Sequence, residues 1–306
     1  MLTRKYLFFL LIISCLTTTS FLVQAVSVVR DPVEVLNNLE NEVIGVAETN
    51  GLVERLNKLE QLLVARNYEE TITERLTRLE RIVYTNRPYD ISLIYKVQAL
   101  EWVLFHEGMP GSVVSRVEKI EKLLFGKIYG GSLNKRLEML ITQVFPEGVR
   151  GQWTDIPEGT LVKVRVKDQL SSIDNQIGTR FRFEIVETII NNGFVLFMKG
   201  ISSNGFIRQV RKPAIFGKDA QLLLDFTKTR AMDGTEVELS YGTKASEINH
   251  SFKWAVGASA AGMLALGPGG ILTGILIRGR QVTIPAGTEF YLQIKNPIRI
   301  YTIKEQ

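Results

Sequence analysis

Leu52-Val-Glu-Arg-Leu-Asn-Lys-Leu-Glu-Gln-Leu-Leu63 is followed 20 residues later by Ile72-Thr-Glu-Arg-Leu-Thr-Arg-Leu-Glu-Arg-Ile-Val83, and the two stretches share one pattern. Both contain an apolar residue, then arginine and leucine, then leucine and glutamate, and a final apolar residue at the same spacings. The apolar residues fall three and four positions apart, which places them on one stripe of an α-helix with the charges beside it. The pattern therefore predicts a short amphipathic helix that recurs along the chain.

The unit recurs through residues 33–146 with a period of 20 or 21 residues. Turn residues such as Asn50-Gly51 and Pro110-Gly111 separate the units, and Thr71 with Glu74 has the form of a capping box. A helix of about 12 residues is marginal alone in water, so we expect neighbouring units to bury one another's apolar stripes. The charged residues that mark the repeat are Arg55, Glu60, Arg75, Glu80, Glu101, Arg116, Glu121 and Arg136.

These repeated charges have two interpretations. They bind a polymeric ligand along the array, or they bridge successive helices, and we favour bridging because charges in repeats usually serve the array itself. Tyr68, Tyr89 and Tyr129 follow their helices and either stack on a ligand or fill the junctions between units, the second being the commoner use of aromatic area. A continuous two-stranded coiled coil is the structural alternative, and the glycine or proline of each period counts against it.

After residue 151 the pattern changes to alternation between apolar and charged side chains, which is typical of half-buried strands. Asn192-Gly193 and Asp233-Gly234 are hairpin signals. We therefore expect an α+β chain of several domains, in which an antiparallel β-barrel or sandwich over residues 152–304 follows the array of short helices. The strands are expected at residues 162–167, 180–185, 221–226, 235–241 and 290–294.

Two segments of the β region echo each other. Ile156-Pro-Glu-Gly-Thr160 and Ile284-Pro-Ala-Gly-Thr288 each directly precede an expected strand, near the two ends of the region. We interpret these strands as matching edges of a closed or nearly closed barrel. Taken singly, each segment is also an ordinary turn before a strand.

The motifs of the second half follow one another in a specific order. Ile156-Pro-Glu-Gly-Thr160 comes first, followed by Phe197-Met-Lys-Gly200, Asp233-Gly-Thr-Glu-Val-Glu-Leu239, a glycine-rich apolar insertion and Ile284-Pro-Ala-Gly-Thr-Glu-Phe290. This series resembles the C-terminal β-barrel of the TrbI-like core proteins of conjugation and type IV secretion machines. The resemblance implies a barrel with a helical antenna inserted late, in a secretion-channel subunit. It covers about half of the chain through order and spacing, and Phe197-Met198 departs from the family's Ile-Pro.

The insertion is a run without charged side chains at residues 254–277. As a helix, its first part would be about 20 Å long, which is too short to span a hydrocarbon core of about 30 Å. We expect a helical hairpin, turning at Gly267-Pro-Gly-Gly270, that enters a membrane or an oligomer, or that packs on the core of the chain itself. Its expected membrane or oligomer contacts are Trp254, Gly257, Ala258, Ala261, Gly262, Leu266, Gly267, Pro268 and Gly274.

The N-terminus has the form of an export signal, with Arg4 and Lys5 before an apolar stretch. Residues 1–25 are expected to be removed after Ala25, with lipidation at Cys15 or an uncut anchor as alternatives. Cys15 is the only cysteine, which excludes thiol chemistry and disulfides from the cleaved protein. We expect an exported, membrane-associated protein of the bacterial periplasm or cell envelope, at the outer membrane where there are two membranes.

The sequence shows no catalytic, cofactor-binding or metal-ligating pattern. His106 and His250 are the only histidines, and His106 is expected to end a repeat helix. The net charge of +5 is too mild and too mixed in sign for a nucleic-acid partner. We expect a non-enzymatic scaffold or assembly protein that contacts envelope proteins or the cell wall, reaches a membrane through residues 254–277 and forms a homo-oligomer. A TrbI-like channel subunit is the alternative, and a peptidoglycan-acting enzyme is a more distant one.

Overall fold

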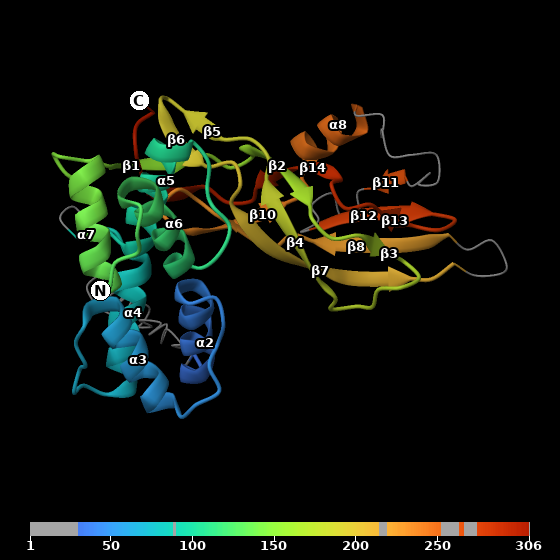
Figure 1. The fold of residues 1–306 in the computed structure, drawn as a ribbon. Coiled ribbons are helices and arrows are strands. Elements are labelled where there is room, and N and C mark those ends of the chain that lie inside the picture. Colours follow the sequence, from blue (N-terminus) through green and yellow to red (C-terminus); the bar gives the residue numbers. More distant parts are fainter. Residues whose placement is uncertain (1–29, 88–89, 214–218, 252–262, 266–273, 306) are drawn as a thin grey trace, which may run out of the picture. The chain divides into compact units, whose positions relative to one another are not determined.

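The computed structural model describes residues 30–87, 90–213, 219–251, 263–265 and 274–305, and this part of the chain begins with six short helices (Figure 1). Each helix coincides with one unit of the repeat, so the predicted short helices are confirmed. The alternative prediction of a continuous coiled coil is wrong. The helices are α2 (Pro32–Val43), α3 (Leu52–Val64), α4 (Ile72–Tyr84), α5 (Leu93–Phe105), α6 (Val113–Phe125) and α7 (Leu133–Val144).

Side-chain caps begin most of these helices. The Thr71 hydroxyl accepts from the backbone N–H of Glu74, and the Glu74 carboxylate accepts from the backbone N–H of Thr71, so the predicted capping box is confirmed. Serines occupy the same position before α5, α6 and α7. His106 ends α5 in the left-handed conformation, and its N–H donates to the carbonyl of Trp102 (3.0 Å), as the sequence predicts.

The apolar stripes of all six helices meet in one hydrophobic core. Helices next to each other in the chain are in contact, but α2 also contacts α6, and α3 contacts α7. The array therefore wraps onto itself and is not the simple stack of neighbours that the repeat suggests. The innermost equivalent positions are Leu36, Leu56, Leu76, Val97, Val117 and Leu137, all buried.

The second half is antiparallel β structure, and its largest sheet has the strand order β11-β12-β8-β7-β4-β2-β14-β10-β9. The five strands expected from alternation are present as β2, β4, β8, β10 and β14. The elements in chain order are β1 (Gln152–Ile156), β2 (Leu161–Val166), β3 (Leu170–Ser171), β4 (Arg180–Ile185), β5 (Ile189–Asn191), β6 (Phe194–Phe197), β7 (Ser202–Arg211), β8 (Ala220–Asp225), β9 (Lys228–Arg230), β10 (Glu236–Ser240), α8 (Thr243–Ser251), β11 (Met263–Ala265), β12 (Gly274–Gly279), β13 (Thr283–Ile284), β14 (Glu289–Ile294) and β15 (Ile298–Thr302).

Smaller ladders join β1 to β15, β3 to β13 and β5 to β6. Asn192 and Gly193 both have positive φ (52° and 76°) in the turn between β5 and β6, which confirms the predicted hairpin. The second predicted hairpin, at Asp233-Gly234, joins β9 to β10. The N–H of Val195 in β6 donates to the carbonyl of Ile303 after β15 (3.1 Å), so these two small ladders lie side by side.

The two echoing segments lead into strands β2 and β14, which pair with each other near the middle of the sheet, with Val164 opposite Phe290. The expectation of matching edge strands is therefore wrong. The two turns are related by an approximate local twofold, because Gly159 donates its N–H to Ile294 (2.9 Å) and Gly287 donates its N–H to Val166 (2.7 Å). Both strands bury alternate apolar side chains on one face of the sheet, and β4 and β10 flank the pair on its two outer edges.

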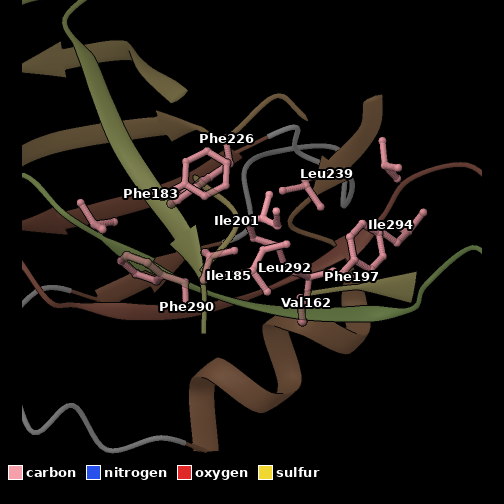
Figure 2. Packing of buried hydrophobic residues seen from close by; sticks show 14 of the residues in the cluster. Val162, Phe183, Ile185, Phe197, Ile201, Phe226, Leu239, Phe290, Leu292 and Ile294 are labelled. Carbon is pink, nitrogen blue, oxygen red and sulfur yellow. The ribbon is translucent and has the colours of Figure 1, made fainter. Parts of the chain in front are cut away.

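The large sheet curls into a half-barrel, not a closed barrel, and its core contains the phenylalanine side chains that Figure 2 shows from close by. The ring of Phe226 packs edge-on against Phe183 (5.1 Å between centroids) and Phe290 (5.9 Å). At the β9 end, the hydroxyl of Thr229 lies 3.2 Å from the hydroxyl of Ser203 in β7. The curl therefore brings β9 and β7 together through side chains and without a strand ladder.

The described part of the apolar run is β structure, so the predicted helical hairpin is wrong there. Strand β11 pairs with β12, with Leu264 opposite Ile277, and β12 pairs in turn with β8. Strand β12 buries Ile275 and Ile277 beside β8, and this non-local pairing decides its conformation. Within the described ranges, no helix combines the length and the apolar character needed to cross a bilayer. Residues 254–262 and 266–273 of the run lie outside the described residues.

Gly200 lies at a backbone contact between the two halves of the chain. The N–H of Gly108 donates to the carbonyl of Lys199 (2.7 Å), and a Cβ added to Gly200 would lie 2.5 Å from the carbonyl oxygen of Gly108. We predict that Gly200→Ala lowers the free energy of unfolding more than Gly178→Ala does, by about 1–3 kcal/mol, in urea denaturation. Gly178 is the matched control, because it has a similar positive φ and open space around its Cβ. Equal losses in the two variants would contradict the close contact.

Candidate functional site

A ladder of buried ion pairs, here called the arginine–glutamate ladder, runs through the helical array. In each rung, an arginine in the first turn of one helix donates from Nε and Nη2 to the two carboxylate oxygens of a glutamate in the preceding helix, 15 residues earlier. The donor–acceptor distances lie between 2.6 and 3.0 Å. The rungs are Arg55–Glu40, Arg75–Glu60, Arg116–Glu101 and Arg136–Glu121.

The rungs are buried and geometrically specific. The arginine side chains are 5–7% exposed and their glutamate partners 0–1%. Two parallel hydrogen bonds match the planar guanidinium to the carboxylate, which is the strongest form of this pair. The hydrogen bond to Glu60 raises the pKa of Arg75, and the bond to Glu40 does the same for Arg55. The ladder residues therefore bridge successive helices, and the ligand-binding interpretation has no exposed guanidinium at these positions.

Three of the four ladder glutamates also hold the loop that leaves their own helix, and the first of them, Glu40, accepts from the backbone N–H of Glu48 (3.0 Å). One oxygen of Glu60 accepts from the backbone N–H of Tyr68 (3.2 Å), and Glu121 accepts in the same way from Tyr129 (3.3 Å). The Tyr68 ring lies under the guanidinium of Arg78 (4.4 Å to the ring centroid). These two tyrosines thus lie at junctions between units, and Tyr89 lies outside the described residues.

The ladder changes at three places. Lys96 occupies the arginine position of α5, where its Nζ lies 3.3 Å from Oδ1 of Asn134 and burial lowers its pKa. The preceding glutamate position is Glu80, which is half-buried. At the ends, Val35 stands at the arginine position of α2 and Ile141 at the glutamate position of α7. The ladder therefore begins and ends within the array, where apolar side chains replace the charged ones.

Helix α5 belongs to both cores of the protein. One side packs in the core of the array, while Tyr95 and Trp102 are part of the β core. The Tyr95 ring meets the Tyr301 ring of β15 edge-on, 5.1 Å between centroids. The side-chain amide of Gln98 lies against the carbonyl oxygens of Ala231 and Met232 and donates to both when its nitrogen faces them. The chain from Pro32 onward accordingly forms one compact unit.

This double role of α5 is not among the expectations from the sequence, although the repeat contains a signal for it. Tyr95, Ala99 and Trp102 occupy positions that carry Glu74, Arg78 and Arg81 in the preceding unit. A repeat helix that is apolar on its outer side needs a second partner, because an exposed side of that kind would be unfavourable. Comparison of equivalent positions would therefore have identified the helix that contacts the β region.

A second contact joins the β9–β10 hairpin to the array. Arg230 of β9 forms an ion pair with Glu42 of α2 (2.9 Å), and its guanidinium lies 5.3 Å from the centre of the Tyr84 ring of α4. Burial raises the pKa of Tyr84 to about 12. In the loop of the same hairpin, Asp233 is buried and accepts from the backbone N–H groups of Tyr301 (2.8 Å) and Thr235 (3.0 Å). Burial raises the pKa of this carboxyl group.

Of the residues expected at membrane or oligomer contacts, Gly274 is the one within the described ranges. It begins β12 opposite Asp225, and an added Cβ would overlap the carbonyl oxygen of Leu224. Glycine is required there because the two strands approach closely. Among the described residues, no group of three His, Cys, Asp or Glu side chains is arranged to hold a metal ion. The side chain of His250 lies outside the described part.

Comparisons with known proteins find distant likeness among solved structures. No family model matches the chain, and no curated protein sequence is similar to it. Among solved structures, the chain is similar to ComB10 of the Com type IV secretion system of Helicobacter pylori, with 13% identity over 47% of this chain and 88% of that chain. The TM-score is 0.26, and a likeness at that level supports no inference about fold or function.

The ladder makes a sharp prediction about stability. Glu60→Gln keeps the shape of one rung but leaves the buried guanidinium of Arg75 without its counter-ion, so we expect the free energy of unfolding to fall by about 3–5 kcal/mol. Urea denaturation of the full chain measures the loss. Glu147→Gln is the control, because it breaks an ion pair with Arg150 whose side chains are 77% and 79% exposed, and we expect less than about 1 kcal/mol there. Similar losses in the two variants would exclude a structural ladder.

Asp233 gives a prediction about pH. Its pKa is raised in the folded chain, so as pH rises the unfolded chain releases this proton first, from about pH 4. The folded state then binds more protons than the unfolded state, and the stabilising contribution of Asp233 falls with increasing pH. We expect the stability of the wild type relative to Asp233→Asn to be highest in acid and to decline above about pH 4. Urea denaturation of both proteins over a pH series measures this difference, and a difference independent of pH would contradict it.

Proposed function

We propose that this chain is a non-enzymatic scaffold or assembly protein of the cell envelope. The observation that carries the proposal is the arginine–glutamate ladder, which uses the most regular charged residues of the chain to hold helices together. Helix α5 then joins the array to the β region because it contributes side chains to the hydrophobic core of each. Such a unit is suited to holding partners at fixed positions.

The hydrogen-bond and ion-pair partners of the buried carboxylates support a structural role. Each one in the described part of the chain holds an arginine or a backbone N–H. Asp225 pairs with Arg208 and accepts from the N–H of Thr227, and Asp233 accepts from two N–H groups. General acid–base catalysis needs a carboxyl or imidazole group within reach of a substrate, whereas these groups are occupied by the fold. The buried carboxylates are Glu40, Glu60, Glu101, Glu121, Asp225 and Asp233.

The proposed location is supported by the N-terminal residues, and the proposed partners by exposed and apolar segments of the chain. Residues 1–25 have the form of an export signal, which supports the periplasm or cell envelope as the destination. On the array, Val33 and Val53 occupy equivalent positions at the starts of α2 and α3, and both are exposed. These two exposed aliphatic side chains, at equivalent positions of neighbouring helices, support contacts with envelope proteins. The part of the apolar run that precedes β12, residues 254–273, supports association with a membrane or with further copies of the chain.

A subunit of a TrbI-like secretion channel is the second candidate. The order of motifs in the β region favours it, because the turns at Pro157 and Pro285, the hairpin at Asp233 and the late insertion follow the order in that family. A channel subunit must form a ring, whereas a scaffold need not. Native mass spectrometry of the protein extracted in detergent separates the two: a closed ring favours the channel, and a monomer or small oligomer favours the scaffold.

Cell fractionation tests the main proposal. We expect the native protein in the envelope fraction, with mass spectrometry of its N-terminus showing Val26 as the first residue, or a lipidated Cys15 if the alternative signal is used. A cytoplasmic marker protein and a known envelope protein serve as controls. Recovery of the uncut chain in the cytoplasm would contradict the proposal. Release of cell-wall fragments by the purified protein would contradict its non-enzymatic character.

A further inference from the structure

Strand β7 ends, β8 begins and β12 ends at one end of the large sheet (Figure 1). Four basic residues of the described part of the chain lie in these strands or directly after them. In the strand register, Arg211 and Arg278 both lie opposite Gln221, one on either side of β8. Residues directly opposite each other share a face of the sheet, and neighbouring strands are about 4.8 Å apart, so the two arginines stand about 10 Å apart on one face. Lys212 and Arg280 complete the group, which we call the basic end, and all four are exposed.

Two exposed isoleucines lie on a loop that borders the basic end. Ile177 is 67% exposed. The N–H of the next residue, Gly178, donates to the carbonyl of Ile207 in β7 (2.8 Å). Ile173 is 42% exposed. The N–H of the preceding residue, Ser172, donates to the carbonyl of Val282 (2.9 Å), which lies two residues after Arg280 in the chain. The loop is therefore hydrogen-bonded both to β7 and to the segment that follows β12.

The basic end differs from the charged face of strands β2, β4 and β14. There, Lys163 and Arg165 each form ion pairs with Glu289, so the charges are balanced. The row across β7, β8 and β12 reads arginine, glutamine, arginine, with no carboxylate in the register. The acids on the adjoining segments are Asp174 and Asp219, both exposed. Positive charge therefore prevails at this end of the sheet.

Basic residues beside exposed aliphatic side chains form a surface suited to anionic phospholipid. The cations attract the headgroups, and the aliphatic side chains enter the boundary between headgroups and acyl chains. In the chain, Arg278 also directly follows the apolar run. A single-stranded nucleic acid would instead require aromatic side chains for stacking, and the exposed apolar residues described at this surface are isoleucines.

We propose that the basic end, with Ile173 and Ile177, docks on the surface of a membrane that contains anionic phospholipid. The proposal rests on the proposed function for the location of the protein, and it deepens that function by naming the surface and the lipid class that it meets. The test is co-sedimentation of the full chain with vesicles of equal parts phosphatidylglycerol and phosphatidylcholine, compared with vesicles of phosphatidylcholine alone. We expect binding to the anionic vesicles, weakening as salt is added.

Variants locate the binding surface. Arg211→Glu combined with Arg278→Glu is expected to reduce the affinity for anionic vesicles by about tenfold or more. Ile177→Ser is expected to reduce it less, and without changing its dependence on salt. The charge control is Lys122→Glu combined with Lys135→Glu, which changes the net charge equally at exposed positions of the array. The apolar control is Ile190→Ser, in an exposed residue of β5.

Several results would overturn the inference. They are equal binding to neutral and anionic vesicles, wild-type affinity in the double arginine variant, or an equal loss in the lysine control. Equally tight binding to duplex DNA that is lost in the same variants would show a general attraction to polyanions, and would also overturn it. Circular dichroism and urea denaturation of each variant exclude unfolding as the cause of a loss.

If the protein is in the envelope but the basic end does not bind lipid, this inference fails and the proposed function stands. If vesicles bind the basic end but cells keep the protein in the cytoplasm, the proposed function fails instead.

Discussion

The bidentate contact between a buried arginine and a glutamate 15 residues earlier is the constraint on which the helical array depends. Helices of 12 or 13 residues have little stability of their own, and apolar stripes alone tolerate sliding of one helix past the next. A helix displaced by one turn would leave two buried charges without partners, which is far more costly than lost apolar contact. The ladder therefore selects one register for each pair of helices while the leucines supply most of the burial.

The array and the β region depend on each other through α5. Its inner side completes the array, and its outer side, with Tyr95 and Trp102, is part of the β core. Around it, Arg230 reaches α2 and α4, and Gly108 donates to the loop before β7. These contacts involve backbone atoms, aromatic rings and a half-buried ion pair at different places along the boundary between the array and the β region. A change at one of them is therefore felt in both halves of the chain.

Local patterns predicted the elements well, and non-local pairing accounts for most of the errors. The helices, the Thr71 capping box and the strands with alternation depend on neighbours in sequence. Val164 and Phe290 are far apart in the chain, so no local signal could show that β2 and β14 pair with each other. The spacing of glycine and apolar residues suggested a helix around Ile277, whereas its pairing with β8 makes it a strand. The repeat identified the ladder residues, but packing was needed to decide between a ligand and a neighbouring helix as their partner.

The ends of the ladder bear on how such a chain can lengthen. Val35 removes the donor from the first helix, and Ile141 removes the acceptor from the last, so neither terminus can engage an extra unit through a charge pair. A tandem duplication of an internal unit, such as residues 52–71, would instead carry both an arginine and a glutamate and restore every pairing around the insertion. Growth by copying from the middle is thus electrostatically permitted, while growth by addition at either terminus is not.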